Sequence, residues 1–581
     1  MNKTSKKIIL LFSAGIFLFN SLTLTAQERI ITDEAKLKFD DVLALVKTRY
    51  VDTVNFNILV EDAIKGMMKD LDPHSEYYTA DEYEKMNEPL QGNFEGIGVQ
   101  FNITRDTIVV QSPISGGPSE KLGIRSGDKI VKIEGKSVAG IKITNNDVIK
   151  KLRGDKGTTV NVSIYRRGLK ELIEYAIVRD KIPIFSVDAS YMLTPDIGYI
   201  KVNRFAETTM EEFRSGLDKL KTKNMKHLVL DLRGNSGGYL KTSIELSDEF
   251  LKDREMIVYT EGVSSPKRDY IATTRGAFEQ GKLVVLIDEG SASASEIVSG
   301  AVQDWDRGLL IGRRSFGKGL VQGPFRLRDN SWLKITTARY YTPTGRCIQR
   351  PYSEGVDEYR KEDERRVESG ELFHQDSIKL ADSLKYYTPN NRLVYGGGGI
   401  MPDIFMPLDT SENSKYLTQI YALGILNDFV NEYTDNRRDE FGSLYPDFET
   451  FDKKFEVSQK LFDEFLAYAD NIIEKNDSAS IVAVEKLVEK LEVDEKLQEQ
   501  IEKKLDVKIE SDVKKVLADQ RVKDLVTSGA HLKNRIKAYI ARSFWQTEAF
   551  FRVINKASPE VQKAIQVISD KTFEEMKIAN K

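Results

Sequence analysis

Residues 283–305 read LVVLIDEGSASASEIVSGAVQDW, an apolar run that passes through a turn of small residues into a helical pattern. The run Leu283–Ile287 has no polar residue, which is typical of a strand buried on both faces. Leu228–Leu232 is a second, largely apolar run of this kind. Helical patterns follow in TMEEFRSGLDKL (209–220) and SEIVSGAVQDW (295–305), and alternation of strands with helices predicts an α/β domain.

The domain extends to both sides of this stretch. Further candidate strands are IGYIKVNRF (197–205), GLLIGRRSF (308–316) and WLKITTARYYT (332–342). A charged segment at about 351–395 interrupts the pattern, and we expect a solvated helix or loop there. These limits predict a core domain over residues 181–410.

The rest of the chain divides by composition. Residues 1–26 combine lysines, a short apolar run and small residues, which predicts a secretory signal peptide and therefore export, to the periplasm or the cell envelope where the host has two membranes. An uncleaved anchor is the alternative. Residues 30–90 have helical periodicity, 91–180 contain short strands and glycine turns, and 411–581 are helical and charged, which predicts an accessory domain.

The composition excludes some classes of protein. The 581 residues carry a net charge of −4, which does not favour nucleic acid as a partner. The single cysteine, Cys347, excludes an intramolecular disulfide. We expect it to be a free structural cysteine, although a nucleophile is conceivable.

Ser293 is the candidate nucleophile. It lies in the turn before a predicted helix, where free N–H groups and the positive end of the helix dipole favour an oxyanion. The alternative is structural, because Ser293-x-x-Glu296 also fits a capping box.

Lys318 is the candidate base. The chain has four histidines, and none has a convincing context. A lysine can replace histidine if burial or a cation lowers its pKa. Lys318 lies between two glycines in FGKGLVQ (316–322), and Gln322 lies four residues on, on the same face of a strand or helix. An anion-binding loop or an exposed turn is the alternative, and the Walker pattern is absent.

The segment LVLDLRGNSGG (228–238) supplies a third element. A buried strand ending in a glycine-rich turn can offer an N–H to an oxyanion, together with the N–H of Ala294. A dinucleotide-type phosphate turn is the alternative, but GNSGG does not match its pattern.

Residues 91–180 resemble a PDZ domain. The resemblance is carried by GIGV (96–99), GIRSGD (123–128) and LRG (152–154). Such domains bind an extended peptide at a sheet edge, and a glycine-rich loop holds its carboxylate. This assigns peptide binding to Gly96, Ile97, Gly98 and Val99.

Over roughly residues 35–410 the chain resembles the carboxy-terminal processing (tail-specific) protease family. The motifs LDPHS, GIGVQF, DLRGNSGG, GSASASE, FGKGLVQ and ARYYTPTGRCIQ occur in the expected order. The resemblance implies Ser293 as nucleophile, Lys318 as base and Gln322 as its orienting amide, with oxyanion donors at the N–H groups of Gly238 and Ala294. The flanking Ser291 and Ser295 receive no such role. The usual triple-glycine turn is Ser236-Gly237-Gly238 here.

The resemblance also implies a multidomain α+β protein with a crotonase-like α/β protease core and a PDZ domain. The function expected is an exported serine endopeptidase that recognises C-terminal or unstructured protein segments through its PDZ domain, in protein processing or quality control. It cleaves them by a Ser–Lys–Gln acyl-enzyme mechanism, without cofactor, metal or nucleic acid. Oligomerisation or adaptor binding through the C-terminal helices is plausible. Two alternatives remain, a PDZ scaffold or chaperone with a silent protease fold and a crotonase-like enzyme acting on acyl thioesters; export argues against the second.

Overall fold

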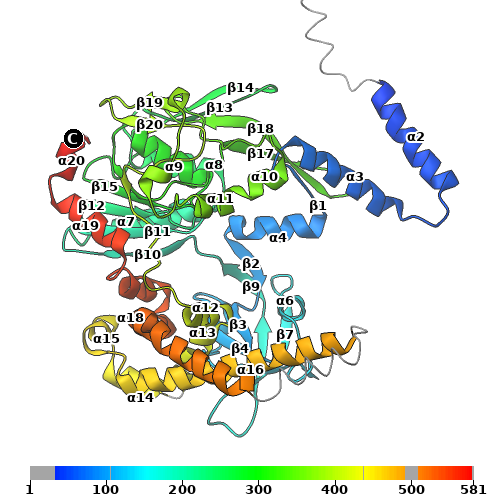
Figure 1. Cartoon of the computed structure of the whole chain (residues 1–581), viewed down its shortest axis with the longest axis vertical. Coiled ribbons are helices and arrows are strands. Elements are labelled where there is room, and N and C mark those ends of the chain that lie inside the picture. The colour runs from blue at the N-terminus through cyan, green and yellow to red at the C-terminus, as the bar shows by residue number, and fades with distance from the viewer. Residues whose placement is uncertain (1–32, 105, 436, 491–507, 579–581) are drawn as a thin grey trace, which may run out of the picture. The chain divides into compact units, whose positions relative to one another are not determined.

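The computed structural model describes residues 33–104, 106–435, 437–490 and 508–578, and the side chains of 477–519 are not described. The predicted signal peptide lies outside these residues. Two compact units, 1–71 and 72–581, make up the chain (Figure 1). The first contains α2 (Asp33–Arg49) and α3 (Phe56–Leu71). The helix α3 ends directly before Asp72-Pro73, where proline removes a helical N–H donor.

The second unit is built around a six-stranded sheet. Its order is β10-β11-β12-β15-β16-β21; β10 is antiparallel to β11, and the other pairs are parallel. The strands are β10 (Val187–Met192), β11 (Ile197–Val202), β12 (His227–Asp231), β15 (Leu283–Ile287), β16 (Leu309–Gly312) and β21 (Ile404–Phe405). The strands predicted within 197–205, 228–232, 283–287 and 308–316 are therefore confirmed.

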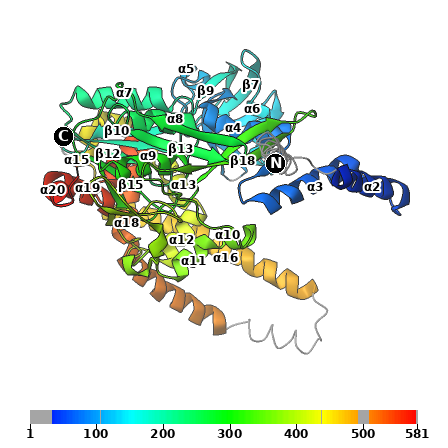
Figure 2. The same ribbon diagram turned by 90° about the horizontal axis from the view of Figure 1, so that it is seen from above.

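Helices cover both faces of this sheet (Figures 1 and 2). One face holds Leu228, Leu230 and Val285 against α7 (Thr209–Lys221), α8 (Leu240–Asp248) and α9 (Ala294–Asp304). The other face holds Val229, Val284 and Leu286, which pack against α19 (Pro559–Ser569) and α20 (Thr572–Glu575). Alternate residues of one strand thus enter two separate cores, which explains the unbroken apolar runs. The helices α19 and α20 belong structurally to the core, although the sequence grouped residues 411–581 as accessory.

A second sheet lies beside the first. Its order is β1-β18-β13-β14, with β17 paired to β18. These strands are β1 (Glu76–Tyr78), β13 (Met256–Gly262), β14 (Ser265–Ile271), β17 (Leu320–Arg326) and β18 (Trp332–Tyr341). Only β18 was predicted. β14 is largely exposed and polar, and the end of β17 is exposed, so neither has the apolar pattern of a buried strand.

The charged insertion is only partly solvated, contrary to the expectation. It forms α10 (Val356–Arg360), α11 (Glu362–Glu368), the 3₁₀ turns η1 (Gln375–Ser377) and η2 (Asp382–Leu384), and the hairpin of β19 (Lys385–Tyr387) and β20 (Leu393–Tyr395). Arg366 is buried and shares Glu371 with Arg314, with nitrogen–oxygen distances of 2.7 Å. Mutual neutralisation makes this burial of charge tolerable, and composition alone does not reveal it.

The PDZ-like region forms its own sheet and core. The order is β3-β4-β5-β7-β8, with β6 paired to β5. The elements are β3 (Val99–Thr104), β4 (Thr107–Pro113), α5 (Pro118–Lys121), β5 (Lys129–Ile133), β6 (Lys136–Ser137), α6 (Asn145–Leu152), β7 (Thr159–Tyr165) and β8 (Ile173–Val178). It follows α4 (Ala80–Gln91), and β2 (Asn93–Gly96) pairs with β9 (Asp180–Pro183) at its two ends.

The remaining helices form a separate aromatic-rich core. They are α12 (Lys415–Ala422), α13 (Ile425–Asp435), α14 (Arg438–Leu444), α15 (Phe448–Lys454), α16 (Gln459–Lys490) and α18 (Lys508–Ile554). The end of α18 meets the core sheet, because Glu548 accepts a hydrogen bond from the Ser190 N–H and forms an ion pair with Lys219. Among the described helices, none combines the length and the apolar character that crossing a membrane requires.

Candidate active site

The predicted nucleophile lies at a strained turn. Ser293 lies at the end of the turn that connects β15 to α9, directly before α9, and its backbone has φ +54° and ψ −109°. A positive φ is uncommon for a residue with a Cβ and occurs most often where surrounding structure enforces it, notably at functional sites. Ser293 is half-buried and borders a cleft of about 600 Å³. The backbone thus presents this hydroxyl at the cleft.

The flanking serines have different surroundings. Ser291 and Ser295 are fully buried, and each hydroxyl donates to a backbone carbonyl oxygen: Ser291 to Leu232 at 2.9 Å and Ser295 to Asn235 at 2.8 Å. Both bonds tie the turn to the glycine-rich segment after β12. Only Ser293 of the three borders the cleft.

Glu296 explains the capping-box pattern and does more than cap. This buried carboxylate accepts from the Ser293 N–H (2.7 Å) and the Lys318 N–H (2.9 Å) at one oxygen. Its other oxygen accepts from the Ser315 hydroxyl (2.5 Å) and the Gly317 N–H (2.7 Å). Burial raises the pKa of Glu296, and these four donors oppose that rise. One carboxylate therefore fixes the backbone of Ser293 relative to that of Lys318.

The glycine-rich turn lies against Ser293. A Cβ on Gly237 would come within 2.9 Å of the Ser293 Cβ and 3.1 Å of the Ala294 nitrogen, and Gly237 has φ +107°. A Cβ on Gly238 would come within 2.2 Å of the Phe205 carbonyl oxygen. Both positions therefore require glycine. Ser236 is exposed, so a side chain is tolerated where the family usually has the first glycine.

The two expected oxyanion donors lie at the same cleft. Gly238 and Ala294 both border it together with Ser293. Within the described residues, neither backbone N–H has a hydrogen-bond partner in the protein. Two free N–H groups next to a serine can stabilise a developing oxyanion.

Lys318 borders the cleft and is held by backbone contacts. Gly317 has φ +90°, and a Cβ on Gly319 would come within 2.8 Å of the Gln349 nitrogen. Glycine on both sides is therefore a steric requirement. Gln322, on β17, also borders the cleft, and its amide nitrogen lies 3.3 Å from the Thr336 hydroxyl. This hydrogen bond restrains the amide nitrogen of Gln322.

The pKa of Lys318 is lowered from 10.5 to about 8. Burial is the main cause, and the positive charge of Lys334 on β18 adds to it. Three carboxylates, those of Glu76, Glu296 and Asp72, act in the opposite direction without reversing the shift. A substantial fraction of Lys318 is thus neutral near pH 8, as a general base requires.

His74 and Cys347 are poor alternatives for the chemistry. Burial and the charge of Lys318 lower the pKa of His74 to about 3, and its Nε2 lies 3.0 Å from the Tyr359 hydroxyl. Burial raises the pKa of Cys347, which keeps the thiol protonated. Neither residue borders the cleft.

The predicted peptide-binding loop lies at the start of an edge strand. Gly96 ends β2, Ile97 is buried, and Gly98 has φ +74°. Val99 begins β3, which pairs with β4 on one side only within the described residues. The other edge of β3 is thus available for a further strand.

Comparison with known proteins agrees with these features. Residues 196–358 match the family described as Peptidase family S41, and 96–177 match the PDZ domain. Residues 20–82 match the activating protease CtpB N-terminal domain, and 416–483 match a family of unknown function. The carboxy-terminal-processing protease of Bartonella bacilliformis is 37% identical over 350 residues, which are 59% of this chain and 80% of that protein. The chain belongs to the carboxy-terminal processing protease family.

Two further proteins are similar to the chain. The carboxy-terminal processing protease CtpB of Bacillus subtilis is 36% identical over 56% of this chain and 68% of its own length. A solved photosystem II D1 C-terminal processing protease is 26% identical over 64% of this chain and 86% of that chain, with a TM-score of 0.34. The protein is thus a C-terminal processing serine peptidase with a PDZ domain and a mixed α+β fold.

Two residues important for this processing protease's site escaped sequence reasoning. The buried Tyr340 hydroxyl lies 2.6 Å from the Lys318 carbonyl oxygen and 3.1 Å from that of Ser293. Asn235 accepts the Ala292 N–H at its carbonyl oxygen, and its side chain binds the Gly237 N–H and the Val202 carbonyl. Both occur in quoted motifs, but a motif does not indicate which backbone groups a side chain contacts.

We expect Glu296→Gln to lower kcat by roughly tenfold or more, because an amide cannot accept from donors at both ends. The thermal midpoint should fall as well. Asp304→Asn is the matched control, since Asp304 is equally buried at the other end of α9, where it pairs with Arg346 at 2.5 Å. We expect Asp304→Asn to lose stability but keep its kcat, and we expect Glu296→Gln to lose both. Equal kcat per folded molecule in both variants would contradict the role of Glu296 in positioning Ser293 and Lys318.

Proposed function

We propose that the chain is an exported endopeptidase with a Ser293–Lys318–Gln322 site. The neutral Lys318 amine accepts the hydroxyl proton of Ser293 while Oγ bonds to the carbonyl carbon of the substrate. The N–H groups of Gly238 and Ala294 stabilise the resulting oxyanion. Protonated Lys318 then gives the proton to the leaving amine, and the acyl-enzyme forms. Water attacks this ester in the same way and releases the new C-terminus.

One observation carries the mechanism. Ser293, Lys318, Gln322 and both free N–H groups border a single cleft, and the lysine has a pKa lowered to about 8. A structural lysine or an inactive scaffold has no need of this combination, so it favours a working hydrolase over a silent PDZ scaffold.

The substrate is proposed to be an unstructured polypeptide with a free C-terminus. The unpaired edge of β3 accepts the tail as an added strand, and residues Gly96, Ile97, Gly98 and Val99 hold its carboxylate. The helix α4 connects the two sites, because Met86 and Leu90 border the cleft while Glu88 pairs with Arg153 of the PDZ domain. No cofactor takes part in this proposal.

The proposal includes three further assignments. The parallel strands with a covering helix layer favour a crotonase-like core, with domain limits near 91–180 for the PDZ domain and 181–410 for the protease, completed by α19 and α20. The leader sequence favours export to the periplasm or cell envelope. N-terminal sequencing of the secreted protein should begin near Gln27.

The test combines a covalent probe with a peptide. A fluorophosphonate should label the peptide that contains Ser293, as located by mass spectrometry. A disordered peptide with an apolar free C-terminus should be cleaved, and its C-terminal amide should be cleaved about tenfold more slowly, because one charge-assisted contact is lost. Labelling at another residue would overturn the assignment of Ser293 as the nucleophile. Equal cleavage of the acid and the amide would overturn the recognition of a free C-terminus.

A further inference from the structure

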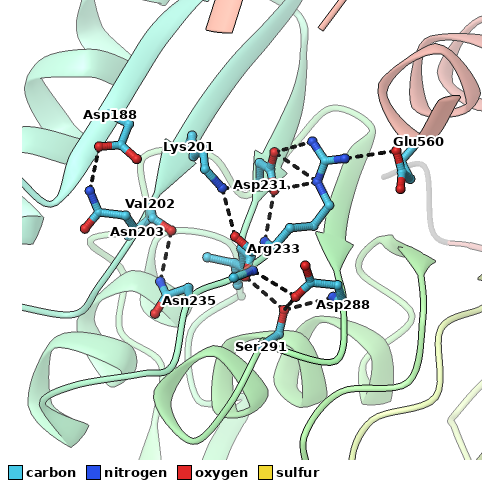
Figure 3. A network of polar contacts seen from close by, with 12 residues as sticks. Asp188, Lys201, Val202, Asn203, Asp231, Arg233, Asn235, Asp288, Ser291 and Glu560 are labelled. Atoms are coloured by element: carbon cyan, nitrogen blue, oxygen red, sulfur yellow. Dashed lines mark hydrogen bonds and ion pairs between the residues drawn. The ribbon is translucent and has the colours of Figure 1, made fainter. Parts of the chain in front are cut away.

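A polar cluster joins the glycine-rich turn to the last helices of the chain (Figure 3). Its centre is Asp231, which is fully buried at the end of β12. The Arg233 guanidinium donates to both carboxylate oxygens, at 2.6–3.2 Å, and the Tyr199 hydroxyl adds a bond of 2.7 Å. The pKa of Asp231 is well below its usual range, since these bonds and the charge of Arg233 outweigh burial.

Glu560 continues the cluster from the first turn of α19. One of its oxygens accepts from Arg233 at 3.0 Å, as Figure 3 shows, and from the Ser558 hydroxyl at 2.9 Å. Its other oxygen lies 3.5 Å from Arg313, which follows β16. Arg313 in turn binds Glu289 at 2.6 Å. A single carboxylate near the C-terminus thereby links two arginines of the core.

These two arginines belong to the segments that form the active site. Arg233 directly precedes the turn that ends at Gly238. Arg313 begins the segment that leads to Lys318, and its partner Glu289 lies in the turn before Ser293. Asp288 lies in the turn before Ser293 and ties it to the glycine-rich turn, because its carboxylate accepts from the Gly234 N–H at 2.8 Å (Figure 3). The same carboxylate accepts from the Ser291 hydroxyl at 3.2 Å.

Glu560 has little freedom to move. Its side chain is 15% exposed, and Val561, Ala564 and Val567 of the same helix are fully buried against the sheet. Arg233 and Arg313 are 18% and 7% exposed, so water compensates little if this partner is removed. The apolar packing of α19 therefore sets the position of a charge that holds two arginines beside the site.

We propose that Glu560 is a positioning residue for the oxyanion turn, so that docking of the C-terminal helices sets the catalytic geometry. It does not border the cleft and touches no reacting atom. It acts through Arg233 on the turn that ends at Gly238, and through Arg313 on the segments of Ser293 and Lys318. This inference rests on the proposed function, because it assigns a support to that same site.

The test uses the full-length protein with Glu560→Gln and Glu560→Asp. Glu560→Gln is expected to lower kcat about tenfold with KM within about twofold, because a displaced oxyanion donor affects the transition state and not substrate binding. Fluorophosphonate labelling of Ser293 should slow by a similar factor, because phosphonylation also develops charge at the oxyanion site. Glu560→Asp keeps the charge and should recover part of both losses.

Glu574→Gln is the control for loss of a carboxylate on the neighbouring helix. Glu574 lies on α20 and pairs with Lys282 at 3.6 Å, before the start of β15 and thus at the opposite end of the sheet from the turns. It should leave kcat and the labelling rate within about twofold of wild type, as expected for an ion pair away from the site. Two results overturn the proposal: kcat and labelling of Glu560→Gln within twofold of wild type, or equal losses in Glu574→Gln. If wild type itself is not labelled at Ser293, the proposed function fails instead.

Discussion

Ser293→Ala is expected to abolish peptide cleavage, with a fall in kcat of about 10⁴-fold or more, because the variant lacks the hydroxyl that forms the acyl-enzyme in the proposed mechanism. Only Ser293 of the three serines in the turn borders the cleft. The variant should also lose all fluorophosphonate labelling. Its fold should persist, because the backbone bonds of residue 293 to Glu296 do not use the hydroxyl.

The neighbouring serines provide the controls for this result. Ser295→Ala removes one buried hydrogen bond to a backbone carbonyl, at a cost of about 1–3 kcal/mol of unfolding free energy. Ser291→Ala removes a bond of the same kind together with the contacts of the Ser291 hydroxyl to Asp288, so its cost should be at least as large. Both should lose stability and remain labelled at Ser293. Retained cleavage in Ser293→Ala, or lost labelling with normal folding in Ser291→Ala or Ser295→Ala, would contradict the assignment of the nucleophile.

Lys318→Ala is expected to lower kcat/KM by about 10³-fold or more, because the proton of Ser293 then has no acceptor. Lys318→Arg should be equally inactive, since a guanidinium keeps its proton at every pH used. In wild type, neutral Lys318 increases as pH rises, because its pKa is about 8. Log kcat/KM should therefore rise with pH up to about 8 and level off above that value. The profile should be measured from about pH 5 to about pH 10.

Lys334→Met tests the cause of that shift. Removing this positive neighbour should raise the pKa of Lys318 and move the rising limb of the pH profile to higher pH.

The stability of Lys318→Met gives an independent test of the lowered pKa. The folded-state pKa is about 8 and the ordinary value is 10.5, so the unfolded chain binds more protons between them. The cost of burying the ammonium is thus fully present below pH 8 and disappears towards 10.5, and Lys318→Met should be more stable than wild type at pH 7. A flat activity profile would contradict the role of Lys318.

The sequence was informative where a pattern has a single physical cause. Leu283–Ile287 is apolar throughout because alternate residues enter two cores, and strand β15 was predicted on that basis. The glycines around Lys318 and before Tyr239 were singled out, and the structure shows that a Cβ would collide there. The site residues followed from such motifs together with the family resemblance.

The features of the fold and the site that the sequence did not predict depend on contacts between segments that are distant in the chain. Gln322 lies on β17, whose register is set by β18, and the exposed residues of β17 give no apolar signal. The buried Arg366 and Glu371 look like surface charges until their partner Arg314 is placed. The link from Glu560 to Arg233 spans more than 300 residues and has no local pattern.

The docking of α19 and α20 on the core sheet means that the second face of this sheet is covered late in synthesis. Synthesis runs from the N-terminus, so every strand of this sheet is made before the helices that cover its second face. Until Phe573 and Ile578 have emerged, Val284 and Leu286 lack their packing partners and Arg233 lacks Glu560. A growing chain that has not yet reached α19 therefore leaves this apolar second face of the sheet uncovered.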